Sequence, residues 1–158
     1  MNDLAQQIGR LLRQRGMTLG VVDSATGGLI SHLITNIPGS SEYYLGSITA
    51  YSNRVKVSVV GVKEDTIRRY GAVSSQVAEE MAAGGLRVLG VDICLADTGV
   101  AGPDGGTEDK PVGLFYIGLS HREVNHSRQH NFPGDRQQNK TAAASAALSW
   151  LKEYLQDL

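Results

Sequence analysis

The feature that most constrains the fold is a change from an apolar run to small residues near the start of the chain. Leu19 to Val22 is followed by small polar residues, by Gly27 and Gly28, and then by the apolar segment Leu29 to Ile34. A short apolar run predicts a buried strand, and apolar residues three to four apart predict a helix. Glycine adopts the dihedral angles that a tight turn requires. The stretch therefore predicts strand, turn and helix, with Ser24 at the carboxyl end of the strand.

This junction has two interpretations. The first turn of a helix has unpaired N–H groups and the positive end of the helix dipole, so an oxyanion or a phosphate would bind well beside Ser24. Alternatively, the stretch is only a capped helix start, with Thr26 as the cap and the glycines serving the turn. The stretch alone leaves both interpretations open.

The order of the remaining patterns predicts an α/β fold. Helices are expected over Leu4–Leu12 with a stop at Gly16, from Gly28 to before Pro38, from a cap at Asn53 through Lys56, over 64–70, from a cap at Ser74 or Ser75 to Leu89, and over Asp135–Leu155. Strands are expected up to Ser24 and over 46–52, Val91–Ala96, 112–119 and 124–132, the last two forming a hairpin across Ser120–Glu123. This order predicts a three-layer α/β/α sandwich with a mixed sheet, in a single domain over residues 1–158.

Charge and cysteine content exclude several classes of protein. The net charge is −1, so bulk electrostatics recruit neither nucleic acid nor an acidic membrane. The single cysteine, Cys94, excludes an internal disulfide, fits a reducing cytoplasm and lies in an apolar run as a small buried side chain. No apolar stretch reaches ~18 residues, and the N-terminus lacks the pattern of a signal peptide. The oligomeric state stays open, a homo-oligomer included.

Three segments with candidate chemistry follow predicted strands: Ser24, the segment from Tyr51 to Lys56, and the glycine-rich loop 98–113. In open α/β sheets, ligands bind outside the carboxyl ends of the strands. A serine attacks a carbonyl only with a base, and a lysine whose pKa is lowered by burial can be that base. Tyr51 would relay the proton or hold the lysine. The alternatives are a solvated surface lysine and a core tyrosine.

Two more features point to anion binding rather than to a metal. The glycines of loop 98–113 can present backbone amides to an anion, although a long connection also needs glycine for its turns. Arg136 would open the last helix beside Asp135, where its planar fork suits a phosphate, unless it is a surface ion-pair partner. His126 and His130 share a strand face but have no third ligand, so no metal site is expected. The motifs of familiar serine hydrolases, P-loops and dinucleotide folds are absent.

Short segments spread along the chain match, in order, the motifs of a known family. They are Asp23–Gly28, Pro38–Ser41, Tyr51–Asn53 with Lys56, Gly61–Val62, Gly71–Ser74, Thr98–Gly106, Lys110–Gly113 and Gly134–Arg136. Together they resemble the CinA C-terminal domain family, whose stand-alone members are nicotinamide-nucleotide amidases. The resemblance covers nearly the whole chain, and the block from Thr98 to Gly113 is its most specific part.

The resemblance implies an amidohydrolase that converts nicotinamide mononucleotide to nicotinic acid mononucleotide and ammonia, on a three-layer α/β/α fold. It implies no metal and no other cofactor, and a small mononucleotide as the binding partner. Larger members carry an additional N-terminal pyrophosphatase-type domain, for which this chain has no room. The implied catalytic residues are Ser24, Tyr51 and Lys56, and the expected substrate-binding residues are Thr26, Gly27, Gly28, Asn53, Thr98, Gly99, Ala101, Gly102 and Arg136.

Several positions depart from the family pattern. Asp23 replaces a glutamate, Ala25 a cysteine, Ala50 a threonine, Ser47 a glycine, Asp97 an apolar residue and Lys140 an arginine. The retained serine, tyrosine and lysine favour chemistry, whereas the altered surroundings favour a changed substrate or lost activity, because the precision of a site depends on its supporting residues. The alternative hypothesis is therefore a catalytically degenerate nucleotide-binding protein of the same fold.

Overall fold

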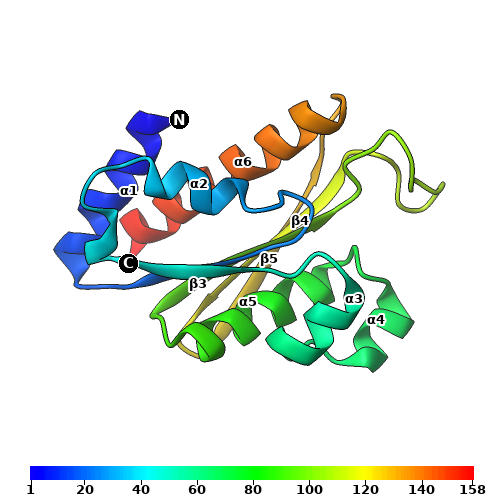
Figure 1. Cartoon of the computed structure of the whole chain (residues 1–158), viewed down its shortest axis with the longest axis horizontal. Coiled ribbons are helices and arrows are strands. Elements are labelled where there is room, and N and C mark those ends of the chain that lie inside the picture. Colours follow the sequence, from blue (N-terminus) through cyan, green and yellow to red (C-terminus); the bar gives the residue numbers. More distant parts are fainter.

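The computed structural model describes all residues, 1–158, and shows three layers (Figure 1). A mixed sheet lies between α1, α2 and α6 on one face and α3, α4 and α5 on the other. The predicted α/β/α sandwich is confirmed. The elements are α1 (Asn2–Arg15), β1 (Leu19–Asp23), α2 (Leu29–Thr35), η1 (Ser40–Glu42), β2 (Tyr44–Thr49), α3 (Asn53–Val55), η2 (Lys56–Val60), α4 (Glu64–Tyr70), α5 (Ser75–Leu89), β3 (Ile93–Gly99), β4 (Leu114–His121), β5 (Val124–Asn131) and α6 (Arg136–Asp157).

The sheet has five strands in the order β2-β1-β3-β4-β5. β1 pairs in parallel with β2 and with β3, whereas β4 pairs antiparallel with β3 and β5. The carboxyl ends of β1, β2 and β3 therefore meet at one edge, together with the segments that follow them. Val22 pairs with Ala96, so the next residues, Asp23 and Asp97, lie side by side on neighbouring strands.

Each face of the sheet has its own core. One cluster of 22 buried residues lies beneath α1, α2 and α6, and a second cluster of 10 lies beneath α5. Burial of this apolar surface is the main stabilising term of such a fold. No helix has both the length and the apolar character needed to cross a membrane.

The segment that leads into the candidate site differs from the sequence prediction. β2 covers Tyr44–Thr49 rather than 46–52. The Ala50 amide still donates to the Asp23 carbonyl (2.8 Å), after which the chain leaves the sheet. Ser52, not Asn53, caps α3, because its hydroxyl accepts the Val55 amide at 3.2 Å. The cap comes one residue early because the strand ends early.

Three further boundaries shift. β3 continues to Gly99, so the first residues assigned to the glycine-rich loop pair with β4 instead. The hairpin turn is tight, since His121 pairs with Val124, and it leaves Arg122 at φ 58°. Residues Lys56–Val60 form a π-helix rather than a continuation of α3. Single π-helical turns often occur at functional sites.

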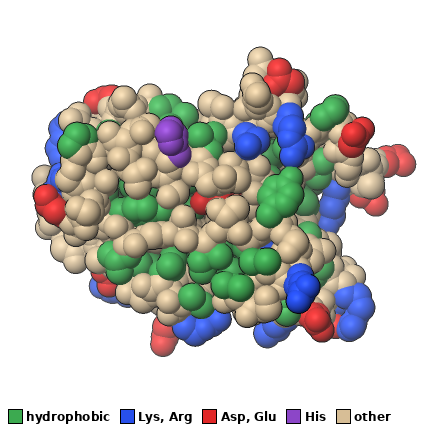
Figure 2. Space-filling model, in the orientation of Figure 1, with side chains coloured by type: hydrophobic (Ala, Val, Ile, Leu, Met, Phe, Trp, Pro, Cys, Tyr) green, Lys and Arg blue, Asp and Glu red, His purple; other side chains and the backbone are tan.

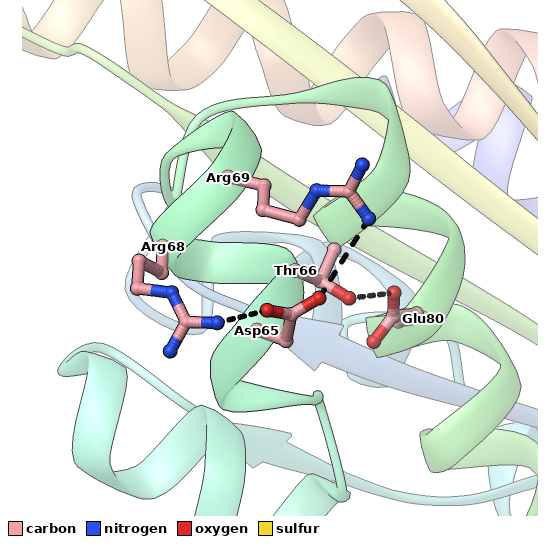
Figure 3. A network of polar contacts seen from close by, with 5 residues as sticks. All are labelled: Asp65, Thr66, Arg68, Arg69 and Glu80. Carbon is pink, nitrogen blue, oxygen red and sulfur yellow. Dashed lines mark hydrogen bonds and ion pairs between the residues drawn. The ribbon is translucent and has the colours of Figure 1, made fainter.

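A polar network fixes α4 on α5 (Figure 3). The Thr66 hydroxyl donates to Glu80 Oε2 at 2.6 Å, and the Lys63 amide donates to Glu80 Oε1 at 2.9 Å. Asp65 forms ion pairs with Arg68 and Arg69 on the exposed side of α4. Exposed ion pairs of this kind contribute little to stability. The two hydrogen bonds to Glu80 are therefore the polar contacts that hold α4 on α5.

Close packing between α5 and the π-helix predicts an effect on stability. A β-carbon at Gly84 would lie 2.0 Å from the Val60 carbonyl oxygen. Alanine usually favours a helix interior over glycine by ~1 kcal/mol, but overpacking costs ~1–3 kcal/mol and moves backbone here. We expect Gly84→Ala to destabilise the protein by ~2 kcal/mol in urea unfolding. Gln76→Ala, on the exposed face of α5, is the matched control, and equal stability of the two variants would contradict the packing.

Candidate functional site

The strand ends enclose a cavity of about 330 Å³ at the edge where β1, β2 and β3 finish. Lys and Arg side chains lie at this end of the molecule, interspersed with Asp and Glu side chains (Figure 2). A larger hollow, about 590 Å³, lies at the opposite end of the strands and contains none of the predicted site residues. The residues that line the first cavity are Ser24, Ala25, Tyr51, Asn53, Lys56, Ala72, Val73, Thr98, Gly99, Val100, Ala101, Gly102, Asp104, Gly105 and Arg136.

Ser24 lies directly after β1 and is 5% exposed, on the wall of this cavity. Its Oγ makes no hydrogen bond within the protein, so the hydroxyl is available to a ligand. The amide of Ala25, which also lines the cavity, has no acceptor within the protein. A free amide directly after a nucleophile is a suitable donor to an oxyanion.

Lys56 is buried, with 2% of its surface exposed, and it lines the same cavity. Burial lowers the pKa of its amine, and the nearby Asp97 carboxylate offsets part of this effect. Its Nζ donates to the Tyr51 carbonyl oxygen at 3.0 Å. The surface alternative for Lys56 is therefore wrong, and a lowered pKa increases the fraction of neutral amine that can accept a proton.

Tyr51 and Arg136 form one wall of the cavity. The Tyr51 side chain is 61% exposed, so it is not a core aromatic. Tyr51 does hold Lys56, but through its main-chain carbonyl. Its phenol instead accepts a hydrogen bond from Arg136 Nη2 at 3.0 Å, and Arg136 Nη1 donates to the Gly102 carbonyl at 2.7 Å. Arg136 thereby joins the start of α6 to the glycine-rich loop.

The glycine-rich loop is fixed by side chains from distant parts of the chain. Thr98 donates its hydroxyl to the Ala72 carbonyl at 2.7 Å. Asn139, fully buried on α6, donates from Nδ2 to the carbonyls of Ala101 and Gly134, both at 3.0 Å. Sequence reasoning missed Asn139. A buried polar residue in a helix is informative only once its partners are known.

Three of the expected binding residues do not line the cavity: Thr26, Gly27 and Gly28. The turn after Ser24 folds inward, so Thr26 is buried and directs its hydroxyl at Asp23 and Asp97. The Thr26 amide donates to Asp97 and the Gly27 amide donates to the Ser24 carbonyl, so neither is free for an oxyanion. Thr26 is also not a helix cap, because α2 begins after Gly28. The cap interpretation of Thr26 was therefore wrong, and its assignment to substrate binding stays a prediction that this inward arrangement does not favour.

The cavity does bring the other expected residues together. Tyr51 and Lys56 come from the segment after β2, Ser24 from the end of β1, and Arg136 from α6. Asn53, Thr98, Gly99, Ala101 and Gly102 complete the wall. Nowhere do three or more His, Cys, Asp or Glu side chains lie close enough together to hold a metal ion.

Fold and site define a class: an α/β protein with a small polar ligand cavity at the carboxyl ends of parallel strands, containing a serine, a buried lysine and an arginine. The family profile described as CinA C-terminal domain matches residues 1–155. The chain belongs to the CinA C-terminal domain family.

Relatives and solved structures agree with this assignment. The chain is 46% identical to a CinA-like protein of Thermotoga neapolitana over 99% of its length, and 50% identical to one of Salinibacter ruber over 89%. It spans only 39% and 34% of those two proteins. A CinA superfamily protein of Klebsiella pneumoniae superposes with a TM-score of 0.96 at 28% identity, covering 99% of this chain and 98% of that one. A competence/damage inducible protein of Agrobacterium tumefaciens superposes at 0.93 with 32% identity, covering 98% and 94%.

Proposed function

We propose that the chain is an amidohydrolase that converts nicotinamide mononucleotide to nicotinic acid mononucleotide and ammonia. The observation that carries the proposal is the meeting of Ser24 with the buried Lys56 in one cavity of about 330 Å³. A free hydroxyl and an amine with a lowered pKa are a nucleophile and its base. The family resemblance supplies the substrate class.

The first half of the reaction forms an ester. Neutral Lys56 takes the Ser24 hydroxyl proton while Oγ attacks the carboxamide carbon, and the carbonyl electron pair moves to oxygen. When the tetrahedral intermediate collapses, the carbon–nitrogen bond breaks and Lys56 returns the proton to the leaving nitrogen, which departs as ammonia. The Ala25 amide is the nearest free donor for the oxyanion in the sequence.

The second half is hydrolysis of that ester. Water attacks the acyl carbon while Lys56 takes its proton, and Ser24 leaves with the proton that Lys56 returns. Because Lys56 acts as a base, kcat/KM should rise with pH through the pKa of its amine. Burial places that pKa below the usual range for a lysine.

The phosphate of the mononucleotide requires a cation at the other side of the cavity. Arg136 uses Nη1 and Nη2 for Gly102 and Tyr51, which hold the guanidinium in place and leave further N–H donors for a ligand. A phosphate held there by charge-assisted hydrogen bonds would direct the pyridine ring toward Ser24. The cavity volume lies within the usual range for small-molecule sites, ~300–1,000 Å³.

The experiment is an assay of ammonia and nicotinic acid mononucleotide from nicotinamide mononucleotide. Stoichiometric formation of both products is expected. If intact, folded protein forms neither product, the amidohydrolase proposal is wrong. Free nicotinamide, which lacks the phosphate, is the control substrate and should react far more slowly.

One observation favours a second candidate, a nucleotide-binding protein without turnover. Lys56 Nζ bonds to a main-chain carbonyl and makes no hydrogen bond to Ser24, and the Asp97 carboxylate favours its charged form. Calorimetry that shows mononucleotide binding without product would support this candidate. Turnover at ordinary enzyme rates eliminates it.

Arg136 provides a separate prediction. Arg136→Gln removes the charge that binds phosphate, so we expect KM to rise about 10-fold or more with a smaller change in kcat, as steady-state kinetics would show. Arg128→Gln is the matched control, because Arg128 pairs with Glu153 far from the cavity. Equal KM values for the two variants would show that Arg136 does not contact the substrate.

A further inference from the structure

Two buried carboxyl groups lie directly beneath Ser24. Asp23 ends β1 and Asp97 lies on β3 next to it, and both are fully buried. Asp97 Oδ2 accepts the Ser24 amide at 3.2 Å, and Asp97 Oδ1 accepts the Thr26 amide at 3.0 Å. Asp97 therefore holds both sides of the turn that presents Ser24. The family pattern described above has an apolar residue at this position.

The Thr26 hydroxyl bridges the two carboxyl groups. Its Oγ1 lies 2.7 Å from Asp23 Oδ1 and 2.5 Å from Asp97 Oδ2. A hydroxyl has one hydrogen and can donate to only one of these oxygens. The other contact is a hydrogen bond only if a carboxyl proton is donated to the threonine oxygen. The two short contacts thus point to one proton held by the Asp23–Asp97 pair, and they fit either carboxyl as the holder.

The rest of the surroundings agrees with one retained proton. Asp23 Oδ2 accepts no hydrogen bond of normal geometry, which disfavours a second buried negative charge. Burial and the neighbouring Asp97 raise the pKa of Asp23 to about 7, although Thr26 and the amides of Ile30 and Gly28 lower it in part. Burial also raises the pKa of Asp97, against hydrogen bonds from Thr26 and Ser24 and the charge of Lys56.

Few other titratable groups reach the pair. Burial raises the pKa of the Cys94 thiol, so it stays neutral. The Lys140 ammonium lies next to the turn, 3.6 Å from where a β-carbon of Gly27 would be. The charged or titratable groups that face the pair are Lys56 on the π-helix, Cys94 on β3, Tyr44 on β2 and Lys140 on α6.

We propose that Asp97 is a positioning residue: with Asp23 and Thr26 it forms a cluster that holds one proton at neutral pH, fixes the Ser24 turn and sets the charge of Lys56. The effect on Lys56 rests on the proposed hydrolase function, whereas the number of protons held by the Asp23–Asp97 pair does not. Below about pH 7 the cluster has one negative charge opposite Lys56, and loss of its last proton adds a second. The second charge favours the lysine ammonium and so opposes its action as a base.

The proton count is tested by unfolding in urea across pH. In the unfolded chain both aspartates have ordinary pKa values, near 3.8, and are ionised from pH ~5 upward. The folded pair then holds about one proton more than the unfolded chain, so its contribution to the free energy of unfolding should fall as pH rises from ~5 to ~8. Asp97→Asn keeps the shape and one acceptor oxygen but lets Asp23 ionise more easily, so the slope should largely disappear.

The effect on Lys56 is tested by the pH profile of kcat/KM. Asp97 is the carboxylate that stabilises the lysine ammonium, and in Asp97→Asn the remaining negative charge lies on Asp23 instead. The acid limb of the profile should therefore move to lower pH by about one unit in this variant. A residue that only packed the turn would lower the rate without moving the limb. Asp109→Asn, in the exposed part of loop 98–113, makes the same charge change and should leave both slope and limb unchanged.

Each outcome decides a different part. The same slope in Asp97→Asn as in the wild type would overturn the shared proton, because the opposite contributions of His121 and His130, whose pKa values burial lowers, cancel in that comparison. If Asp97→Asn changes the slope of unfolding free energy against pH as expected but leaves the acid limb of kcat/KM where it is in the wild type, the action of Asp97 on Lys56 would be overturned. If the wild type releases no ammonia, the proposed hydrolase fails, but the unfolding slope still decides the proton count. If Asp97→Asn does not fold, carbon-13 titration of the wild-type aspartates serves instead, and two carboxyl groups that both titrate near 4 would contradict the cluster.

Discussion

Replacement of Ser24 by alanine is expected to lower kcat for ammonia release about 10⁴-fold, because loss of the nucleophile leaves only binding and oxyanion stabilisation. The side chain makes no hydrogen bond within the protein, so the fold and its stability should be unaffected. Affinity for the mononucleotide should also be preserved, since Arg136 and the loop remain. Ammonia release and calorimetry on the same preparation measure both effects.

Ser58→Ala is the control for this variant, because Ser58 is exposed on the segment that carries Lys56. It should retain full activity. If Ser24→Ala also turned over at the wild-type rate, covalent catalysis by Ser24 would be rejected.

Replacement of Lys56 by methionine should have an effect of similar size on turnover, about 10³-fold, because the proposed general base is lost. Most substitutions of buried residues destabilise a protein, whereas this one should not. Lys56 is buried with one hydrogen bond to a carbonyl and no ion pair within 4 Å, and methionine has a similar volume without the charge. We expect Lys56→Met to be at least as stable as the wild type at pH ~7 in urea unfolding.

Lys63→Met is the control for loss of a lysine at an exposed position nearby. It should change neither turnover nor stability appreciably. A Lys56→Met variant that was both active and destabilised would mean that the amine is structural, with its role limited to holding the Tyr51 carbonyl.

The layers of this fold follow from local patterns. Apolar spacing predicted α1 and α5, and the continuous apolar run around Cys94 predicted a buried strand, because these elements bury a whole face. Two late strands separated by a short polar segment predicted the hairpin of β4 and β5. The order of helices and strands then left few architectures open.

The boundaries around the site were harder to predict for a physical reason. β2 lies at the edge of the sheet and alternates between half-buried and exposed residues, so its apolar signal is weak. The π-helix that carries Lys56 packs closely against Gly84 of α5, a contact between segments that are apart in the sequence. No local pattern encodes such a contact.

In the candidate site, too, some residues were predictable from local sequence and others depend on contacts between distant segments. Ser24, Lys56 and Arg136 were predicted from residue type and motif, and the cavity brings them together. The Asp23–Asp97 pair depends on the register of two parallel strands that are 74 residues apart in sequence. Sequence alone showed Asp97 only as a departure from a family pattern. Thr26 was assigned to the ligand from its place in the motif after Ser24, whereas its observed inward orientation depends on contacts with both aspartates.

The measurement that tests the central claim most directly is a crystal structure of the Ser24→Ala variant with nicotinamide mononucleotide. We expect the carboxamide carbon within about 4 Å of the residue 24 β-carbon, which places the wild-type Oγ in attack range, with the amine of Lys56 on the same side and the phosphate on Arg136. A mononucleotide bound in the hollow beside Gly16 and His121, or one with its carboxamide facing solvent, would contradict the account.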